Sequence, residues 1–314
     1  MARNSVLAFD LGGTKLAAAL VNRSGKVLER RSVEVDKSSV IAPVQQILQL
    51  ARELRSGKNG KAEIAAVGVA VPGLVRHDGT VWAPNLPGWK RMALARRLKQ
   101  ALRVPVVVES DRNAAVLGEA WRGGARGKSD VIVLMLGTGI GAGILSEGRL
   151  VRGAHELSGC AGWMVVTDER GPEAAGVGQL ESLAAGPAIA RAAKEELARG
   201  SGGLLAKIPA ESITAYEVAE AARRGDLPSI KVYHRAGRLL GHAVANLVSL
   251  FDPQVVVIGG GLASAGDLFM DALKQSMKEA AQPLAGKKVR VVLSRLGGNA
   301  NLLGAAHLAW ELIP

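Results

Sequence analysis

The chain has 314 residues, of which 48% are hydrophobic and 3% aromatic, and its formal net charge is +12. This composition suffices for a packed core and favours two lobes over one, and no apolar run is long enough to predict a transmembrane helix. The single cysteine, Cys160, excludes an internal disulfide and a cysteine-rich zinc site.

The positive charge is distributed over the chain in small groups, for example at 30–31, 96–97 and 287–288. Because few aromatic side chains could stack on bases, we interpret it as a solvated basic surface, with an attraction for phosphorylated substrates as the second interpretation. No signal peptide precedes the first predicted strand, so we expect a cytoplasmic protein that binds neither nucleic acid nor membrane.

The first predicted strand, residues 5–10, is apolar and ends in an acid, Asp10. A turn follows with Gly12, Gly13, Thr14 and Lys15, and it leads into strands predicted at 16–21 and 27–33. Glycines in such a turn let backbone N–H groups approach phosphate oxygens, and the Thr and Lys add side-chain donors. A single glycine pair between strands is more often only a hairpin turn.

Helices are predicted at 39–55 and 91–102, on either side of a strand at 64–71 that Pro72-Gly73 ends. A long polar loop follows this strand, with Asn85 between Trp82 and Trp89. Long loops often carry function, although the two tryptophans are also explained as packing anchors.

A strand at 104–109 turns at Ser110-Asp111 into a helix at 113–121. Asp111 therefore follows the carboxyl end of a strand and begins a helix, which is where ligands bind in open α/β sheets. Considered alone, this Asp is more simply a helix N-cap. The two glycine-rich hairpins make a catalytic base the better interpretation.

The second half of the chain repeats the pattern of the first. A strand at 130–136 meets a turn with Gly137, Thr138 and Gly139, and strands at 144–145 and 149–151 follow. An internal repeat of this kind predicts two similar lobes that face a common cleft.

The remaining residues are predicted to be mostly helical. A glycine-rich segment at 153–178 leads to helices at 179–199, 211–223 and 227–251, with Glu181 near the start of the first. A strand at 254–258, three glycines that include Gly260 and Gly261, and a helix at 267–281 give a layout common in nucleotide sites. The alternative is that the three glycines only form a tight connection between the strand and the helix. A strand at 289–293 and a helix at 301–312 follow.

Taken together, the motifs resemble those of the ROK family of sugar kinases and related regulators over nearly the whole chain. Residues 10–15 resemble its first phosphate motif, 110–119 its catalytic motif, 136–143 its second phosphate motif and 252–261 its adenosine-side motif. The resemblance implies an α/β, actin-like (ribonuclease-H-like) ATPase fold with two lobes around a central cleft. We expect a small lobe at 1–112, closed by a C-terminal helix at 301–314, and a large lobe at 113–300.

The resemblance also implies a function, the ATP-dependent phosphorylation of a glucose-like hexose by a homodimer with Mg²⁺. Asp111 would be the general base, and Asp10 would hold Mg²⁺, in the simplest case through water. Sugar contacts would come from Gly73, Asn85, Ser110, Asp111 and Glu181, with Glu156 as a further candidate. The donor side would be bound by Asp10, Gly12, Gly13, Thr14, Lys15, Gly137, Thr138, Gly139, Gly260 and Gly261.

The chain departs from the family pattern where the sugar is bound. Ser110 replaces an Asn, and Cys160 and Trp163 replace the Glu and His of a Gly-Glu-x-Gly-His motif. In the family that His often also ligates zinc with a cysteine cluster, and residues 171–178 contain no cysteine, so we predict no zinc site. Trp163 would stack on a sugar face or fill the space. An N-acetylhexosamine kinase, a polyphosphate-dependent glucokinase and a non-catalytic sugar-binding regulator remain the alternatives.

Overall fold

The computed structural model describes residues 5–56 and 63–313, and it contains two five-stranded mixed sheets. The first has the strand order β3-β2-β1-β4-β7 and the second the order β10-β9-β8-β11-β12, with matching strand directions. The repeat predicted from the two glycine-rich hairpins is therefore present in the sheet topology. The strands are β1 (Ser5–Leu11), β2 (Lys15–Asn22), β3 (Val27–Glu34), β4 (Ile64–Val71), β7 (Val106–Ser110), β8 (Val131–Leu136), β9 (Ile140–Ser146), β10 (Arg149–Leu150), β11 (Val255–Gly259) and β12 (Arg290–Leu293).

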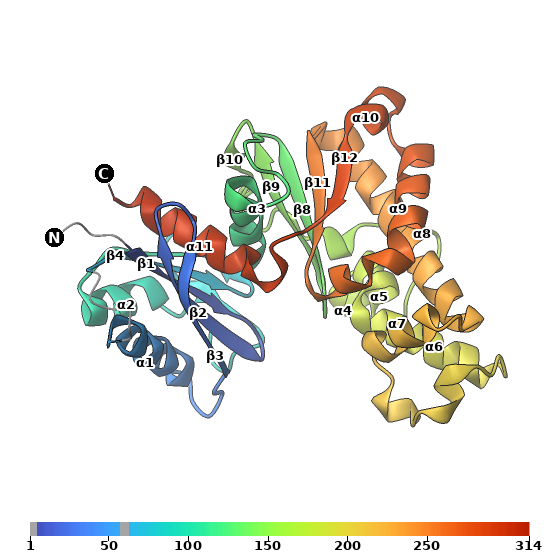
Figure 1. Cartoon of the computed structure of the whole chain (residues 1–314), viewed down its shortest axis with the longest axis horizontal. Coiled ribbons are helices and arrows are strands. Elements are labelled where there is room, and N and C mark those ends of the chain that lie inside the picture. The colour runs from blue at the N-terminus through green and yellow to red at the C-terminus, as the bar shows by residue number, and fades with distance from the viewer. Residues whose placement is uncertain (1–4, 57–62, 314) are drawn as a thin grey trace.

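The helices form three layers around the two sheets (Figure 1). Helices α1 (Ala42–Ser56) and α2 (Leu94–Leu102) cover the outer face of the first sheet, where Phe9 and Ile47 are fully buried. Helices α3 (Asp111–Arg122) and α11 (Ala300–Glu311) lie between the sheets. The outer face of the second sheet is covered by α5 (Gln179–Ala184), α6 (Gly186–Ala198), α7 (Ala215–Arg223), α8 (Leu227–Phe251), α9 (Gly266–Ala280) and α10 (Pro283–Lys288).

Helix α11 comes last in the chain but packs against the first sheet and against α3. Leu302 and Ala306 are fully buried in one cluster with Val6 of β1 and Ala65 of β4. A Cβ at Gly304 would lie 1.7 Å from the Ala114 carbonyl oxygen of α3, so only glycine allows this close approach. Residues from the far end of the sequence thus cover the inner face of the first sheet, while the expected small lobe at 1–112, closed by the C-terminal helix, and large lobe at 113–300 stay predictions.

One predicted helix, 179–199, is wrong, because the structure has two helices there. Ala185 between α5 and α6 has an extended backbone, with ψ of 169°. Pro187 explains the break, since its ring would clash with the carbonyl group four residues earlier and it has no N–H to donate. The one-turn helix α4 (Ala174–Val177) precedes α5, and α10 was not predicted.

Three helices begin three or four residues later than predicted, namely α1, α2 and α7. Residues before α2 are held extended because Met92 and Val81 exchange two backbone hydrogen bonds of 2.9 Å. Helix α7 begins after Thr214, whose hydroxyl and the Glu217 carboxylate form a capping box. This Thr-x-x-Glu spacing is a start signal that the sequence does contain.

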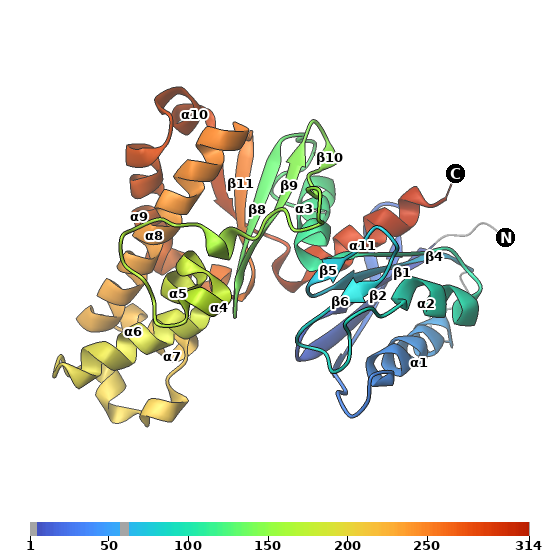
Figure 2. The same ribbon diagram turned by 180° about the vertical axis from the view of Figure 1, so that it is seen from behind.

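The long loop after β4 carries a small hairpin, β5 (Leu74–Val75) and β6 (Val81–Trp82), on the side of the first sheet that faces the second lobe (Figure 2). Trp89 is buried and donates a hydrogen bond from Nε1 to the Val40 carbonyl oxygen at 2.8 Å. The packing-anchor interpretation holds for this residue, whereas Trp82 is 39% exposed. In the described part of the chain, no helix is long and apolar enough to cross a bilayer. Residues 1–4, on which the expectation about a signal peptide partly rests, lie outside it.

Candidate active site

Asp10 lies near the end of β1, between the two lobes. Its Oδ1 accepts a hydrogen bond from Asn301 Nδ2 at 3.1 Å. The pKa of Asp10 is raised to about 6. Burial is the largest cause of the rise and the nearby Asp111 carboxylate adds to it, whereas the Asn301 hydrogen bond and the charge of Arg30 lower the pKa. The electrostatic effect of Asp111 places the two predicted acidic residues close to each other.

Asp111 is the first residue of α3, and the N-cap position belongs to Ser110. The Oδ1 of Asp111 accepts a hydrogen bond from the N–H of Arg112 at 2.8 Å. Burial raises the pKa of this carboxyl, and the Arg112 hydrogen bond and charge offset the rise in part. A carboxylate that is made more basic by burial is suited to accept a proton.

A hollow of about 390 Å³ lies beside Asp10 and joins the two lobes. The other predicted residues on its wall are Gly260 and Gly261, which follow β11. Asn301 also lines it, and its Oδ1 is buried with no hydrogen-bond partner in the structure. An acidic oxygen and an unpartnered amide oxygen are ligands that Mg²⁺ accepts, so this wall fits the magnesium ion expected at Asp10.

A second hollow of about 790 Å³ adjoins the first at Gly261. Gly137 and Thr138, from the turn between β8 and β9, form one wall. The hollow is also lined by residues that the sequence patterns did not single out: Pro187, Arg191, Lys194, Thr214 and Tyr216. Tyr216 is 67% exposed, and the two basic side chains could pair with anionic groups.

A third hollow, of about 360 Å³, brings the predicted sugar residues Asn85 and Glu181 together with Thr138 and Gly139. The Oε2 of Glu181 accepts the N–H of Ile140 at 2.7 Å, and burial raises the pKa of this carboxyl. Thr138 also lines the second hollow, so the hollow with the predicted sugar residues adjoins the one at the second glycine turn. A Cβ on Gly13 would be 3.7 Å from the Asn85 Cβ, so the first turn is a neighbour of this site.

Other predicted residues do not line these three hollows, namely Gly12, Gly13, Thr14, Lys15, Gly73, Ser110 and Asp111. The side chains of Thr14 and Lys15 are exposed, and the N–H of Gly12 closes the turn on the Lys15 carbonyl oxygen at 2.8 Å. Gly73 has φ of +96°, and a Cβ there would be 2.3 Å from the Trp82 carbonyl oxygen. Its role in the backbone therefore explains this glycine without a ligand.

The segment after β10 runs across the second lobe toward α5 (Figure 2), and it contacts the residues on either side of the turn that carries Asp111. Arg152 forms an ion pair with Glu109 at 2.8 Å, and Glu156 lies 2.9 Å from His77 of the β5–β6 loop. Glu156 has a left-handed backbone, with φ of +58°, which is uncommon for a residue other than glycine. Apart from Glu156, sequence patterns did not identify these residues, because they pair with partners far away in the chain.

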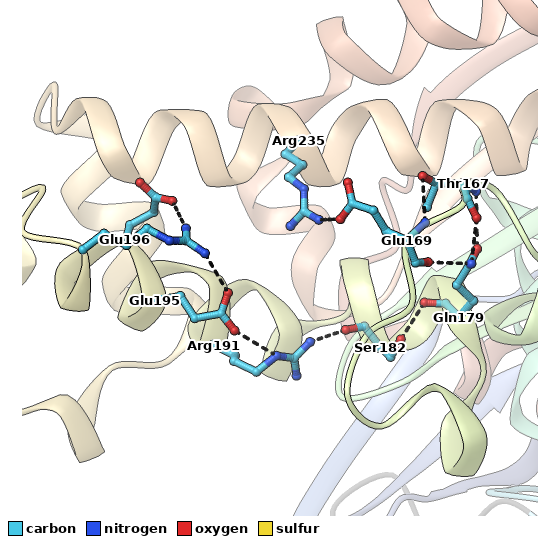
Figure 3. Close-up of polar contacts among 9 residues, drawn as sticks. Thr167, Glu169, Gln179, Ser182, Arg191, Glu195, Glu196 and Arg235 are labelled. Atoms are coloured by element: carbon cyan, nitrogen blue, oxygen red, sulfur yellow. Dashed lines mark hydrogen bonds and ion pairs between the residues drawn. The ribbon is translucent and has the colours of Figure 1, made fainter.

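The start of α5 is held to residues 166–169 by the buried side-chain amide of Gln179, whose contacts with Thr167 and Glu169 are drawn in Figure 3. Its Oε1 accepts the N–H of Val166 at 2.8 Å, and its Nε2 donates to the Thr167 and Glu169 carbonyl oxygens at 2.8 and 2.6 Å. The Glu169 carboxylate also pairs with Arg235 of α8. Within the described residues, no group of three His, Cys, Asp or Glu side chains could hold a metal ion, and the absence of zinc stays a prediction.

Comparison with known proteins extends these observations. The model of the ROK family matches residues 6–311. The chain is 33% identical over 323 residues to a glucokinase of Thermotoga maritima, with 100% of this chain and 99% of that protein covered. It is similar to a ROK family glucokinase from Streptomyces griseus solved with glucose and AMPPNP, with a TM-score of 0.81, 31% identity, and 98% and 99% of the chains covered. A ROK hexokinase from Thermus thermophilus has a TM-score of 0.80 at 29% identity, with 98% and 99% covered.

Proposed function

Because this chain belongs to the ROK family, has the actin-like ATPase fold and is a sugar kinase, we propose that it transfers the γ-phosphoryl group of ATP to a hydroxyl of a glucose-like hexose. The observation that carries this proposal is the shared lining of the three hollows. Gly261 joins the first to the second, and Thr138 joins the second to the third. A nucleotide in the second hollow would thus direct its phosphates toward both Asp10 and the sugar residues.

In this proposal Asp111 accepts the proton of the attacking sugar hydroxyl. Phosphoryl transfer depends on positioning and charge stabilisation more than on covalent chemistry, and burial raises the pKa of Asp111, which makes its carboxylate a better proton acceptor. Asp10 and the Asn301 amide oxygen would hold Mg²⁺, which neutralises phosphate charge when bound. The glycine turns at 12–13 and 137–139 would offer backbone N–H groups to phosphate oxygens.

The sugar would occupy the third hollow, where Glu181 and Asn85 would accept and donate hydrogen bonds to its hydroxyls. Cys160 and Trp163 stand where the family has Glu and His, so the hydroxyl contacts differ from the family pattern. Trp163 is 56% exposed and lies next to Gly162, whose Cβ would be 2.9 Å from Glu181 Cβ. The exposed indole of Trp163 is available to stack on a sugar face.

A panel of sugars tested for ADP release from ATP examines this proposal. We expect turnover with glucose or a close epimer and much weaker turnover with N-acetylglucosamine and N-acetylmannosamine. Preference for an N-acetylated sugar, or use of polyphosphate in place of ATP, would instead support the alternative kinases. Sugar binding without turnover of any donor would point to a regulator. Light scattering of the purified protein tests the homodimer that we also propose.

A further inference from the structure

Both residues that flank Asp111 are tied to one segment of the second lobe, residues 152–158. On one side, the N–H of Ser110 donates to Glu109 Oε1 at 2.8 Å, and Arg152 donates to Glu109 Oε2 from Nη2 at 2.8 Å and from Nε at 3.2 Å. On the other side, Arg112 donates from Nε to the carbonyl oxygen of Ser158 at 3.0 Å. The turn that carries Asp111 is therefore held from both directions.

The Glu109 carboxylate is the centre of this arrangement. It is 6% exposed, and its Oε1 also accepts a hydrogen bond from Asn113 Nδ2 at 3.0 Å. Burying a carboxylate is costly unless an opposite charge and several hydrogen-bond donors accompany it. The Arg152 guanidinium supplies that charge, and its two nitrogens also fix the direction in which the carboxylate points.

The Asp111 side chain has few contacts of its own. Its carboxylate accepts hydrogen bonds from the backbone, namely from the N–H of Arg112 at 2.8 Å and from its own N–H. Its direction is consequently set by the backbone of residues 110–112 and by whatever fixes that backbone. Hydrogen bonds to Glu109 and to Ser158 do so.

We infer that Arg152 is a positioning residue for phosphoryl transfer, which acts through Glu109 and the Ser110 N–H to aim the Asp111 carboxylate at the acceptor hydroxyl. This inference rests on the proposed role of Asp111 as general base. Arg152 does not need to touch either substrate. Its loss should therefore lower kcat while the binding of sugar and ATP stays nearly unchanged.

The test compares the variants Arg152→Met and Arg152→Lys with the control Arg149→Met. Arg149 is exposed on β10, and its side chain makes no hydrogen bond or ion pair within the part of the chain that the structure describes. Because a displacement of about 1 Å costs on the order of 100-fold in rate, we expect Arg152→Met to lower kcat by about 10- to 100-fold. Calorimetric affinities for glucose and for a non-hydrolysable ATP analogue should change by less than about threefold.

Two further variants separate positioning from simple charge neutralisation. The double variant Glu109→Gln, Arg152→Met removes both charges of the Glu109–Arg152 pair, while Glu156, whose Oε2 lies 3.9 Å from Arg152 Nε, keeps its contact with His77. A role of Arg152 in neutralising Glu109 predicts recovery of kcat, and a positioning role predicts that kcat stays low. Arg152→Lys keeps the charge without the paired donors, and it should retain an intermediate kcat and remain folded if Arg152→Met does not. Near-parental kcat in Arg152→Met or in the double variant would overturn the inference.

The variant Asp111→Asn, measured in parallel, distinguishes a failure of the proposed general-base role of Asp111 from a failure of the positioning role of Arg152. If it keeps turnover, the proposed function of Asp111 is wrong and the role of Arg152 fails with it. If it is inactive while Arg152→Met turns over at the rate of Arg149→Met, only the positioning role is wrong.

Discussion

Asn301, in the first turn of the last helix, donates a hydrogen bond to Asp10 at the end of the first strand, with 3.1 Å between Nδ2 and Oδ1. This contact joins residues 291 positions apart at the wall of the hollow between the lobes. It also lowers the pKa of Asp10, although burial outweighs it and the pKa is about 6. Protons and Mg²⁺ should therefore compete for this carboxylate in the physiological pH range.

The first prediction concerns Asp10 and stability. Because its pKa is about 6 in the folded protein and about 4 when unfolded, its contribution to stability is fully present below pH 4 and is lost as the pH rises through 6. Asp10→Asn should raise the free energy of unfolding at pH 8 by on the order of 1–3 kcal/mol. Urea titrations at pH 5 and pH 8 measure this, with exposed Asp168→Asn as the control. Equal pH dependence in wild type and Asp10→Asn would contradict the prediction.

The second prediction concerns the general base. Asp111→Asn should lower kcat by about 10²–10⁴-fold with affinities for sugar and ATP largely unchanged. Since burial raises the pKa of Asp111, kcat/KM of the wild type should decline as the pH falls through that pKa, and the residual activity of the variant should lack this decline. A variant with near-parental turnover would mean that Asp111 only stabilises the start of α3.

The third prediction concerns Gly260 and Gly261, which are adjacent in the chain but should respond differently to substitution by valine. A Cβ at Gly261 meets no atom within 4 Å, so Gly261→Val should fold and raise the KM for ATP about tenfold more than that for sugar, by blocking the two hollows it lines. Gly137→Val should behave alike, since its Cβ would also lie in open space. Gly260 differs, because it has φ of +84° and a Cβ there would be 2.2 Å from the Leu136 carbonyl oxygen.

Gly260→Val should accordingly lower the melting temperature or prevent folding instead of changing donor affinity selectively. Thermal unfolding of the three variants, followed by steady-state kinetics on those that fold, provides the measurement. The interpretation of Gly261 as a donor-site wall fails if its variant raises both KM values equally.

The fourth prediction concerns sugar affinity. A hydrogen bond to a charged group contributes about 1.5–3 kcal/mol, so Glu181→Gln should weaken sugar binding tenfold or more while ATP binding changes little. Asn85→Ala should have a smaller effect in the same direction. Asp168→Asn, at an exposed acid outside the three hollows, is the control. If calorimetry finds parental sugar affinity in both Glu181→Gln and Asn85→Ala, the sugar binds elsewhere.

The fifth prediction concerns metal removal. The Gln179 side chain accepts a hydrogen bond from Val166 and donates to Thr167 and Glu169 (Figure 3), so the segment is held without a metal ion. Chelators should therefore leave the melting temperature of the purified protein unchanged, and metal analysis should find no stoichiometric zinc. Gln179→Ala should instead make this segment more accessible to proteases. One zinc per chain that is lost together with the fold would refute this.

Local patterns in the sequence predict most of the strands and the turns that carry Asp10, Asp111 and Gly137. These features depend on alternating or helical spacing of apolar residues and on glycine, which act over a few positions. Contacts such as Arg152 with Glu109, 43 residues apart, have no such local signal, because they arise only when the two lobes pack. The break before Pro187 could have been predicted, since proline inside a helical pattern interrupts it.

The packing of α11 has a consequence for the order of events during synthesis. The strands of the first sheet leave the ribosome early, yet Val6 and Ala65 on its inner face are covered by residues such as Leu302 and Ala306, which are made more than two hundred residues later. Until then this apolar face has no partner, and such exposed surfaces attract other nascent chains. We therefore expect that a chain truncated before residue 300 depends on chaperones and is readily degraded.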